Sequence, residues 1–193
     1  MAGPTAEFWQ ERFENKQTPW DRGRCSPGLL SWLDAWALTP CRIAVPGCGT
    51  GWEVAELAQQ GFDVVGIDYT QAAVDKTLEY CQKQGVSAEI IRADVLSYDS
   101  TAPFDDVYGQ TCLCALHPDH WVAYAGQLRA WLKPGGVLAQ FQRPAARGLR
   151  FPGAVNPCIL NLHPISGLAT PVKREIAPHV RRAVQHWIIA WRG

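Results

Sequence analysis

Hydrophobic positions in the first 142 residues follow two alternating patterns. Short apolar runs, such as residues 43–45 and 64–67, suit strands that are buried on both faces of a sheet. Between these runs, apolar residues recur every three or four positions, which is typical of amphipathic helices. We therefore predict helices over residues 5–17, 71–84 and 120–132, one that opens at Ser26-Pro27 and one that Gly61 ends, and strands over residues 42–45, 64–68, 88–91, 104–114 and 137–141.

Strands that alternate with helices at this spacing predict an α/β fold. The sheet is expected to be open, doubly wound and mostly parallel, with helices on both faces. From residue 143 onward the pattern changes, because that segment carries eight basic residues, one acid and six of the 14 prolines. Prolines at this density disfavour a long helix and a central strand. We predict one domain over residues 1–142, and a divergent, basic, proline-rich C-terminal segment of that domain over residues 143–193, in which residues 185–191 read as a closing strand.

A glycine-rich turn and an acidic residue are the first candidate binding features. Gly47, Gly49 and Gly51 follow the first strand directly, and Asp68 stands at the carboxyl end of the second. Neighbouring parallel strands joined by right-handed crossovers end at the same edge of the sheet, so the turn and the carboxylate should face one crevice. A nucleoside can lie across such a crevice, whereas without a ligand the glycines would only form a tight strand-to-helix turn.

The spacing of these glycines distinguishes between nucleoside cofactors. Dinucleotide sites use G-x-G-x-x-G and receive a diphosphate at the helix start. Here the third glycine comes one residue early, and the bulky Trp52 and the acidic Glu53 occupy the helix start. An adenosine attached to a cationic sulfonium fits better, because it requires a backbone cradle and an acid but no anion site. A nicotinamide-dependent oxidoreductase is therefore disfavoured.

Composition narrows the range of partners and compartments. The chain carries 18 basic and 18 acidic residues, which gives no indication of nucleic acid or a membrane as a partner. Its start lacks a basic region followed by a long apolar stretch, and no 18 consecutive residues are apolar, so we expect neither a secretion signal nor a membrane span. Seven cysteines, an odd number, favour reduced thiols over a disulfide framework. We expect a cytoplasmic monomer that acts on a small molecule.

Two motifs carry a family resemblance. They are QTPWDRGRCSP over residues 17–27 and VPGCGTG over residues 45–51, followed by Asp68, Asp94, an uncharged fourth strand and Lys133-Pro134-Gly135-Gly136. In this order they resemble the class I S-adenosylmethionine-dependent methyltransferases. The first motif resembles the amino-terminal signature of the thiopurine S-methyltransferase family, which also includes halide and thiol methyltransferases.

The resemblance extends over about residues 7–142 and implies a Rossmann-like, S-adenosylmethionine-binding methyltransferase domain with an amino-terminal helical cap. In this family, aromatic residues from the amino-terminal segment cover the cofactor, and Phe13 stands where a relative has tryptophan. The family's cofactor-binding positions match Trp9, Phe13 and Trp20 for the cover, Gly47 for the methionine part, Asp68 for the ribose hydroxyls, Asp94 and Val95 for the adenine, and Gln110 at a position that is often aromatic in relatives.

The segment Cys112-x-Cys114-x-x-His117-x-x-His120 allows a metal-binding alternative, since sulfur and imidazole ligands bind zinc. If residues 107–114 form a strand, however, the two cysteines share one face while the two histidines lie beyond its end. A tetrahedral site would require the loop to fold back. The corresponding family segment lines the mouth of the active site without a metal, so we expect none and interpret both cysteines as buried thiols.

The resemblance implies transfer of a methyl group from S-adenosylmethionine to a small soft nucleophile, namely a thiol, thiopurine, halide or chalcogen anion. Such a transfer depends on alignment and the exclusion of water more than on acid or base chemistry. No catalytic residue is assigned, although His117 and His120 could orient the acceptor. The C-terminal segment departs from the family pattern. A reading frame altered near residue 143, or a replaced terminus, would leave a catalytically impaired S-adenosylmethionine-binding domain, which is the alternative function.

Overall fold

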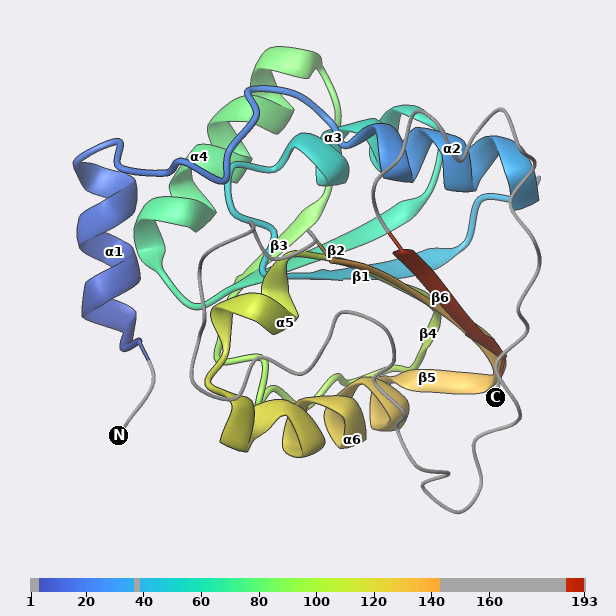
Figure 1. The fold of residues 1–193 in the computed structure, drawn as a ribbon. Coiled ribbons are helices and arrows are strands. Elements are labelled where there is room, and N and C mark those ends of the chain that lie inside the picture. Colours follow the sequence, from blue (N-terminus) through green and yellow to red (C-terminus); the bar gives the residue numbers. More distant parts are fainter. Residues whose placement is uncertain (1–3, 37–38, 143–186, 193) are drawn as a thin grey trace.

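The computed structural model describes residues 4–36, 39–142 and 187–192, and six strands of this part of the chain form one sheet (Figure 1). The strand order is β3-β2-β1-β4-β5-β6. The first five strands are parallel, and β6 pairs with β5 in the antiparallel sense. The strands are β1 Arg42–Pro46, β2 Asp63–Asp68, β3 Glu89–Arg92, β4 Phe104–Gln110, β5 Leu132–Gln142 and β6 Trp187–Arg192.

Helices cover both faces of the sheet, which confirms the predicted α/β architecture (Figure 1). α2, α3 and α4 lie on one face, α5 and α6 lie on the other, and α1 packs against α4 beyond the carboxyl ends of the strands. None of the described helices is long and apolar enough to cross a membrane. They are α1 Ala6–Glu14, α2 Pro27–Trp36, α3 Trp52–Gln59, α4 Gln71–Gln84, α5 Cys112–Ala115, the 3-10 helix η1 Pro118–His120 and α6 Trp121–Trp131.

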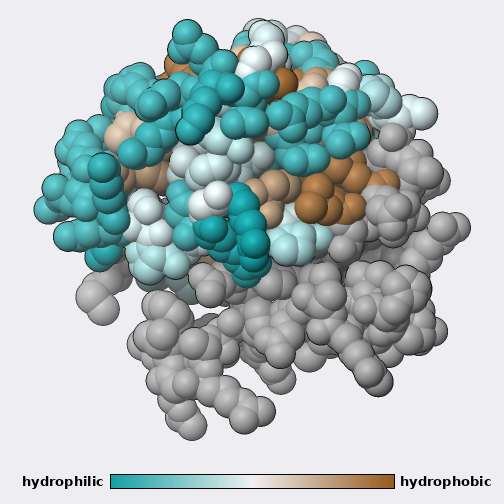
Figure 2. All heavy atoms as spheres, turned by 90° about the horizontal axis from the view of Figure 1, so that it is seen from above, coloured by the Kyte–Doolittle hydropathy of each residue, from teal (hydrophilic) through white to brown (hydrophobic). Residues whose placement is uncertain are grey.

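The apolar runs of the central strands are explained by burial on both sides. Ile43 and Val45 point toward α2 and α3, whereas Ala44 between them points toward α6, and all three are 0–2% exposed. Successive side chains of a strand alternate between the two faces, so a strand covered on both faces has no polar positions. The outer surface on the side of α3 and α4 is mostly hydrophilic, as expected for helices with one buried face (Figure 2).

Capping residues explain why both ends of α4 and the start of α1 agree with the prediction, whereas α1 ends at Glu14 and not at residue 17. The Thr70 hydroxyl accepts a hydrogen bond from the amide of Ala73, and Gly85 ends α4 in the left-handed conformation at φ 68°. α4 therefore spans the predicted residues 71–84. The hydroxyl of Thr5 caps α1 in the same way, by accepting from the amide of Phe8.

β4 is shorter than predicted. The strand expected over residues 104–114 ends at Gln110, because Thr111 adopts a left-handed backbone at φ 62°. Residues other than glycine rarely adopt this conformation, so the apolar pattern gave no sign of the break. The chain then enters α5, which carries both Cys112 and Cys114. The prediction that these two cysteines share a strand face is wrong.

β5 begins at Leu132 instead of residue 137, because its pairing with β4 shifts register beside Asp106. Such an irregularity leaves backbone groups without ladder partners. The Asp106 side chain compensates by accepting a hydrogen bond from the amide of Val137 at 3.0 Å. Gly136 is required in this bend, since a Cβ there would lie 2.5 Å from the carbonyl oxygen of Asp105.

The C-terminal segment is described only in part. The closing strand predicted over residues 185–191 is found as β6 at residues 187–192. Residues 143–186, which carry the prolines and most of the basic side chains, lie outside the described residues. The division of the chain at residue 142 stays a prediction.

Candidate cofactor site

The glycine turn after β1 owes its shape to left-handed backbone conformations. Gly47, Gly49 and Gly51 have φ values of 64°, 60° and 85°, which only glycine adopts without strain. The Gly47 amide donates to the carbonyl of Ile67 at 2.7 Å, so the turn folds onto the end of β2. The turn thereby lies at the carboxyl edge of the sheet, as the sequence predicted, with Gly47 and Gly49 half-buried.

Two of these glycines also have neighbours that leave no room for a side chain. A Cβ on Gly51 would lie 2.7 Å from the side chain of Thr77 on α4. A Cβ on Gly47 would lie 3.0 Å from the Cys112 side chain. The Thr77 hydroxyl donates to the carbonyl of Gly49 at 2.9 Å and so ties the turn to α4. The turn is thus held in place by contacts within the chain.

Asp68 lies where the sequence predicted, at the tip of β2 against the glycine turn. Its Oδ2 accepts from the amide of Gly49 at 3.0 Å, and its Oδ1 accepts from the amide and the hydroxyl of Thr70 at 3.1 and 3.2 Å. The side chain is 7% exposed, and this burial raises the pKa of the Asp68 carboxyl despite these hydrogen bonds. A carboxylate has about four acceptor positions. In these contacts Oδ2 has the single partner Gly49, whereas Oδ1 accepts twice from Thr70.

Asp94 and Val95 follow β3 beside this carboxylate. The amide of Ala93 donates to the carbonyl of Asp68 at 2.8 Å, which holds the two strand tips together. Oδ1 of Asp94 accepts from the amide of Leu96 at 2.9 Å and closes a turn. Oδ2 of Asp94 makes no hydrogen bond with a described residue. The Val95 side chain is 6% exposed and packs in the core below the turn.

The three predicted aromatic residues lie together, and one of them, Phe13, lies against the glycine turn. The ring of Trp20 lies 5.4 Å from that of Trp9 and 6.1 Å from that of Phe13, in edge-to-face geometry. Phe13 is 5% exposed, and its ring would lie 3.7 Å from a Cβ on Gly49. The Gln10 side chain on the same helix accepts from the amide of Ala72 in the first turn of α4 at 3.1 Å. α1 is thus fixed at the crevice by both aromatic and polar contacts.

Asp21 is a site residue that sequence reasoning missed. Its Oδ2 accepts from the Thr50 hydroxyl at 2.5 Å, and its Oδ1 accepts from the Trp52 indole at 2.7 Å and from the amide of Gly23 at 2.8 Å. The available signal was its place inside the QTPWDRG motif, directly after Trp20. The carboxylate connects the amino-terminal segment to the glycine turn and to the start of α3.

Glu53 also binds the amino-terminal segment. Its Oε1 accepts from the amide of Ser26 at 2.9 Å, directly before α2. Burial raises the pKa of the Glu53 carboxyl, and the Ser26 hydrogen bond counteracts this effect in part. This acid at the start of α3 therefore has a structural partner within the chain.

Two further residues stand at the strand tips. Gln110 ends β4, is half-buried, and its Oε1 accepts from the Tyr108 hydroxyl at 2.8 Å. Tyr69, which sequence reasoning also missed, follows Asp68 and keeps 41% of its surface exposed. The available signal was its place directly after the predicted strand tip at Asp68.

The cysteine and histidine segment spreads out in the structure. Cys112 is 8% exposed beside Gly47, whereas Cys114 is exposed and its thiol donates to the carbonyl of Thr111 at 2.9 Å. His117 accepts from the amide of Asp119 as the cap of η1. Within the described residues, no group of three or more histidine, cysteine, aspartate or glutamate side chains is placed to hold a metal ion. Burial raises the pKa of the Cys112 thiol to about 12, so it stays protonated.

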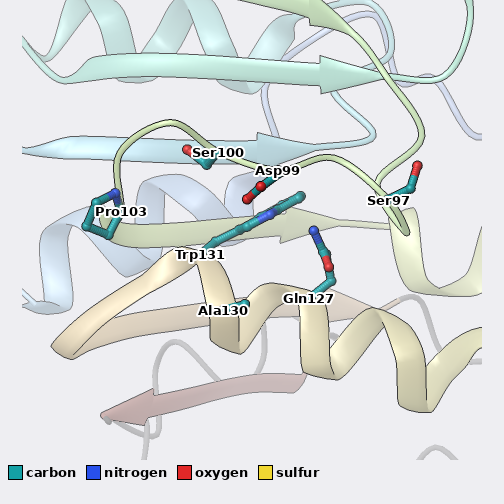
Figure 3. A pocket seen from close by; sticks show the side chains of 7 residues that line it. All are labelled: Ser97, Asp99, Ser100, Pro103, Gln127, Ala130 and Trp131. Atoms are coloured by element: carbon teal, nitrogen blue, oxygen red, sulfur yellow. The ribbon is translucent and has the colours of Figure 1, made fainter.

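A depression lies away from these residues, between the loop that precedes β4 and α6 (Figure 3). The carbonyl of Tyr98 beneath it accepts from the Trp131 indole at 3.0 Å and from the Gln127 amide. None of the predicted site residues lines this depression, which is formed by Ser97, Asp99, Ser100, Pro103, Gln127, Ala130 and Trp131.

Comparisons with known proteins show the family of the chain. The family model of thiopurine S-methyltransferase matches residues 4–148. Thiocyanate methyltransferase 1 of Arabidopsis thaliana is 31% identical over 138 residues, which cover 70% of this chain and 61% of that protein. The thiopurine S-methyltransferase of Pseudomonas putida is 26% identical over 147 residues, which cover 66% of this chain and 67% of that protein. The chain spans less than two thirds of the length of the plant relatives it matches.

A solved structure extends the comparison to the fold. The crystal structure of Burkholderia thailandensis 1,6-didemethyltoxoflavin-N1-methyltransferase, with bound 1,6-didemethyltoxoflavin and S-adenosylhomocysteine, superposes with a TM-score of 0.73. The sequence identity is 18%, and the match covers 97% of this chain and 86% of that chain. At this identity the likeness shows the fold alone, and the Rossmann-like prediction is confirmed.

Proposed function

Because this chain belongs to the thiopurine S-methyltransferase family, we propose that it transfers a methyl group from S-adenosylmethionine to a small soft nucleophile, such as a thiol, a thiopurine, a halide or a chalcogen anion. One observation carries the proposal. The Asp68 carboxylate is bound to the Gly49 amide, in a glycine turn that lies against an aromatic cluster. This arrangement offers an adenosyl group a carboxylate, a bare backbone and aromatic faces at one place.

The residues at the strand tips fit the two ends of an adenosyl group. Oδ2 of Asp68 can accept from a ribose hydroxyl in addition to the Gly49 amide. Oδ2 of Asp94 can accept from the exocyclic amine of the adenine, and the Val95 backbone borders the same place. The Gly47 amide donates to the carbonyl of Ile67, the residue before Asp68, and the methionine part would approach the Gly47 backbone. Gln110 would border the cofactor from the side of β4.

The aromatic cluster fits the cationic sulfur. Trp9, Phe13 and Trp20 pack edge to face, and Phe13 lies against the turn. An aromatic face near a cation contributes about 0.5–2 kcal/mol, and the rings also exclude water. Phe13 supplies such a face without the indole donor that a tryptophan would add.

The expected reaction makes few chemical demands on the protein. S-adenosylmethionine, when bound, supplies a methyl group on a sulfonium that is ready for in-line displacement. The residues of this chain align the acceptor with that methyl group and exclude water. Alignment alone is worth about 7–11 kcal/mol in ideal intramolecular cases. This leaves no required role for a general base, which agrees with the engagement of Asp21, Glu53 and Asp68 in hydrogen bonds within the chain.

The test is incubation of the protein with methyl-labelled S-adenosylmethionine and a panel of thiols, a thiopurine, iodide, thiocyanate, selenite and tellurite. We expect labelled product from at least one acceptor. Asp68→Ala should abolish binding of the cofactor in calorimetry, whereas Asp75→Ala, an exposed aspartate on α4, should leave it unchanged. Unchanged affinity in Asp68→Ala would refute the proposed site.

Binding without transfer to any acceptor of the panel would instead favour the alternative of a catalytically impaired S-adenosylmethionine-binding domain.

We further propose that the protein works as a cytoplasmic monomer without a nucleic acid partner. The equal numbers of acidic and basic residues and the lack of a disulfide pattern support this proposal. Light scattering of the purified chain at micromolar concentration would test its oligomeric state.

A further inference from the structure

Thr77 is a buried polar residue in the middle of α4, and its hydroxyl bonds outside its own helix. The side chain is 0% exposed. A threonine inside a helix commonly bonds the carbonyl of the residue four positions earlier in that helix. The Thr77 hydroxyl instead donates to the carbonyl of Gly49 at 2.9 Å. Because a buried hydroxyl without a partner is costly, this contact accounts for a polar side chain at a core position.

The hydroxyl and the methyl group of Thr77 make different contacts with the glycine turn. The one hydroxyl proton is directed to Gly49, so the Cys48 thiol, 3.7 Å from the Thr77 oxygen, is the donor in that pair. The Thr77 methyl carbon lies 2.7 Å from the place where a Cβ on Gly51 would stand. Substitutions that remove one group and keep the other can therefore separate the hydrogen bond from the packing.

The Gly49 backbone connects Thr77 to Asp68. The Gly49 carbonyl accepts from α4, whereas the Gly49 amide donates to Oδ2 of Asp68 at 3.0 Å. Burial raises the pKa of Asp68, and among its hydrogen bonds the one from Gly49 counteracts this effect most strongly. The Gly49 amide thus stabilises the charged form of the Asp68 carboxyl and orients its Oδ2.

Both oxygens of Asp68 depend on α4 in this way. Oδ1 accepts from the amide and the hydroxyl of Thr70, which caps the start of α4. Thr77 follows seven residues later, about two helical turns along the same helix. Thr70 therefore orients one carboxylate oxygen directly, and Thr77 orients the other through Gly49.

We infer that Thr77 is a positioning residue of the cofactor site, whose hydroxyl fixes the Gly49 backbone so that the Asp68 carboxylate is aligned with the ribose hydroxyls. This inference rests on the proposed function. Because Thr77 is 0% exposed, it acts on the cofactor only through the residues that it holds. A ligand without ribose hydroxyls should therefore bind equally well with or without the Thr77 hydroxyl.

The experiment separates the contribution of the ribose hydroxyls from the rest of the cofactor. Two ligands are titrated into the full-length protein in a calorimeter: S-adenosylhomocysteine and its analogue without the 2′- and 3′-hydroxyls. Thr77→Val keeps the shape of the side chain and should weaken S-adenosylhomocysteine binding about 10-fold, the factor that corresponds to one hydrogen bond to a charged group. The analogue should bind Thr77→Val within about 2-fold of the wild type, because it shares no contact with the lost hydroxyl.

Thr77→Ser is the conservative variant, since it keeps the hydroxyl and removes the methyl group beside Gly51. It should lower the Tm of the protein through lost packing and still bind S-adenosylhomocysteine within about 2-fold of the wild type. Thr101→Val, at an exposed threonine in the loop before β4, is the matched control and should leave both affinities unchanged.

Several results would overturn the inference and leave the proposed cofactor site standing. They are equal weakening of both ligands in Thr77→Val, equal loss of S-adenosylhomocysteine affinity in Thr77→Val and Thr77→Ser, unchanged affinity in Thr77→Val, and a Thr77→Val protein that does not fold. Each would show that the hydroxyl serves the fold alone or has no effect on the site. A wild type that does not bind S-adenosylhomocysteine would instead refute the proposed function itself.

Discussion

At the scale of single residues, the carboxylate of Asp21 connects the amino-terminal segment to the glycine turn. It accepts three hydrogen bonds, from Thr50, Trp52 and Gly23, at 2.5–2.8 Å. Hydrogen bonds to a charged group contribute about 1.5–3 kcal/mol each. Because Trp20 directly precedes Asp21, the carboxylate also fixes the aromatic cover above the turn.

Asp21→Ala is therefore expected to weaken S-adenosylhomocysteine binding by about 10-fold or more, equivalent to about 1.4 kcal/mol. Asp21→Asn keeps an oxygen that can accept from Trp52 and Gly23, so it should retain part of that affinity. Calorimetric titration measures both values, with Asp75→Ala as the control. Equal affinity in Asp21→Ala and the wild type would show that the aromatic cover does not depend on this carboxylate.

The buried carboxyl of Asp68 predicts a pH dependence of cofactor binding. Burial raises the pKa of Asp68 above the ordinary value of about 3.9, and only the carboxylate accepts fully from ribose hydroxyls. Binding is thus complete above the raised pKa and is lost as the pH falls through it. We expect affinity to decline on acidification at a higher pH than for an ordinary aspartate. Asp68→Asn should bind more weakly at neutral pH and lose this decline. The pKa of Glu53 is also raised by burial, but Glu53 is present in both proteins. A decline that only the wild type shows therefore belongs to Asp68.

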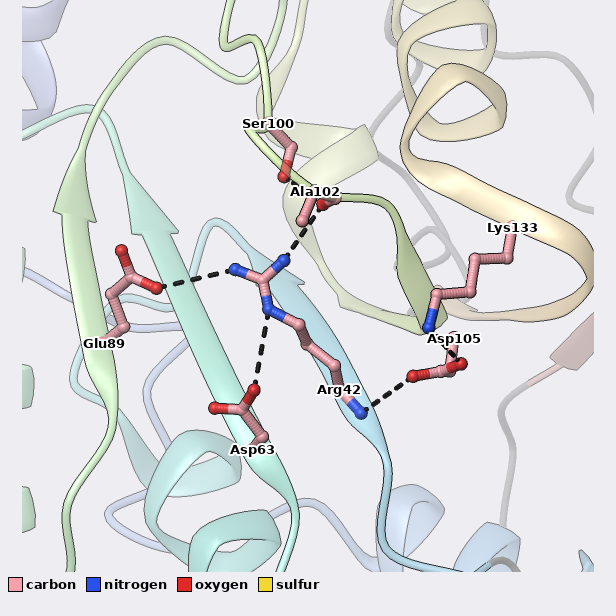
Figure 4. A network of polar contacts seen from close by, with 7 residues as sticks. All are labelled: Arg42, Asp63, Glu89, Ser100, Ala102, Asp105 and Lys133. Atoms are coloured by element: carbon pink, nitrogen blue, oxygen red, sulfur yellow. Dashed lines mark hydrogen bonds and ion pairs between the residues drawn. The ribbon is translucent and has the colours of Figure 1, made fainter.

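At the scale of secondary structure elements, the amino ends of the strands are held together by charged side chains (Figure 4). Arg42 at the start of β1 contacts Asp63 of β2 at 3.5 Å and Glu89 of β3 at 3.6 Å. Its backbone amide donates to Asp105 of β4, which in turn accepts from Lys133 of β5 at 2.7 Å. The Lys133 ammonium holds the pKa of Asp105 below its ordinary value. Five strands are thereby linked at the edge opposite the crevice.

Arg42→Ala should lower the free energy of unfolding by about 1–2 kcal/mol. Each partly exposed ion pair is worth at most about 1 kcal/mol, and the guanidinium also packs 4.7 Å from the centre of the Phe104 ring. Chemical denaturation measures the difference. Arg92→Ala, an exposed arginine at the end of β3, is the matched control and should change stability by less than about 0.5 kcal/mol. An equal effect of the two substitutions would exclude a special contribution of Arg42.

Elements whose ends are set by local chemistry could be predicted from the sequence. α4 begins after the Thr70 cap and ends at Gly85, and both signals lie within the helix or next to it. The break after Gln110 could not be predicted, because Thr111 adopts a glycine-like conformation that no neighbouring residue announces. Nor could the contacts of Asp21, since its partner Trp52 lies 31 residues away in the sequence. The sequence pattern thus predicts helices, strands and the residues at strand tips. It does not predict contacts between side chains from segments that lie far apart in the sequence.

At the scale of the whole molecule, the amino ends and the carboxyl ends of the strands carry different groups of residues. The amino edge carries the ion pairs around Arg42 (Figure 4), and the carboxyl edge carries the glycine turn, Asp68 and Asp94. The length of the strands separates these groups, with a core on both faces between them. Substitutions without shared contacts usually have additive effects on stability. Changes at one edge should therefore leave the property of the other edge intact.

This separation predicts the thermal behaviour of the protein with ligand. At 100 times its dissociation constant, S-adenosylhomocysteine should stabilise the fold by about 2.7 kcal/mol. For a chain of this size, that corresponds to a rise in Tm of about 5–11 °C. Arg42→Ala should lower the Tm of the free protein and keep the whole ligand-dependent rise, because the ion pairs do not contact the crevice. Asp68→Ala should lose the rise at the same ligand concentration, and the double variant should combine both effects additively in calorimetry. Loss of the ligand-dependent rise in Arg42→Ala would contradict the separation, since it would mean that the order of the crevice depends on the charged residues at the far edge.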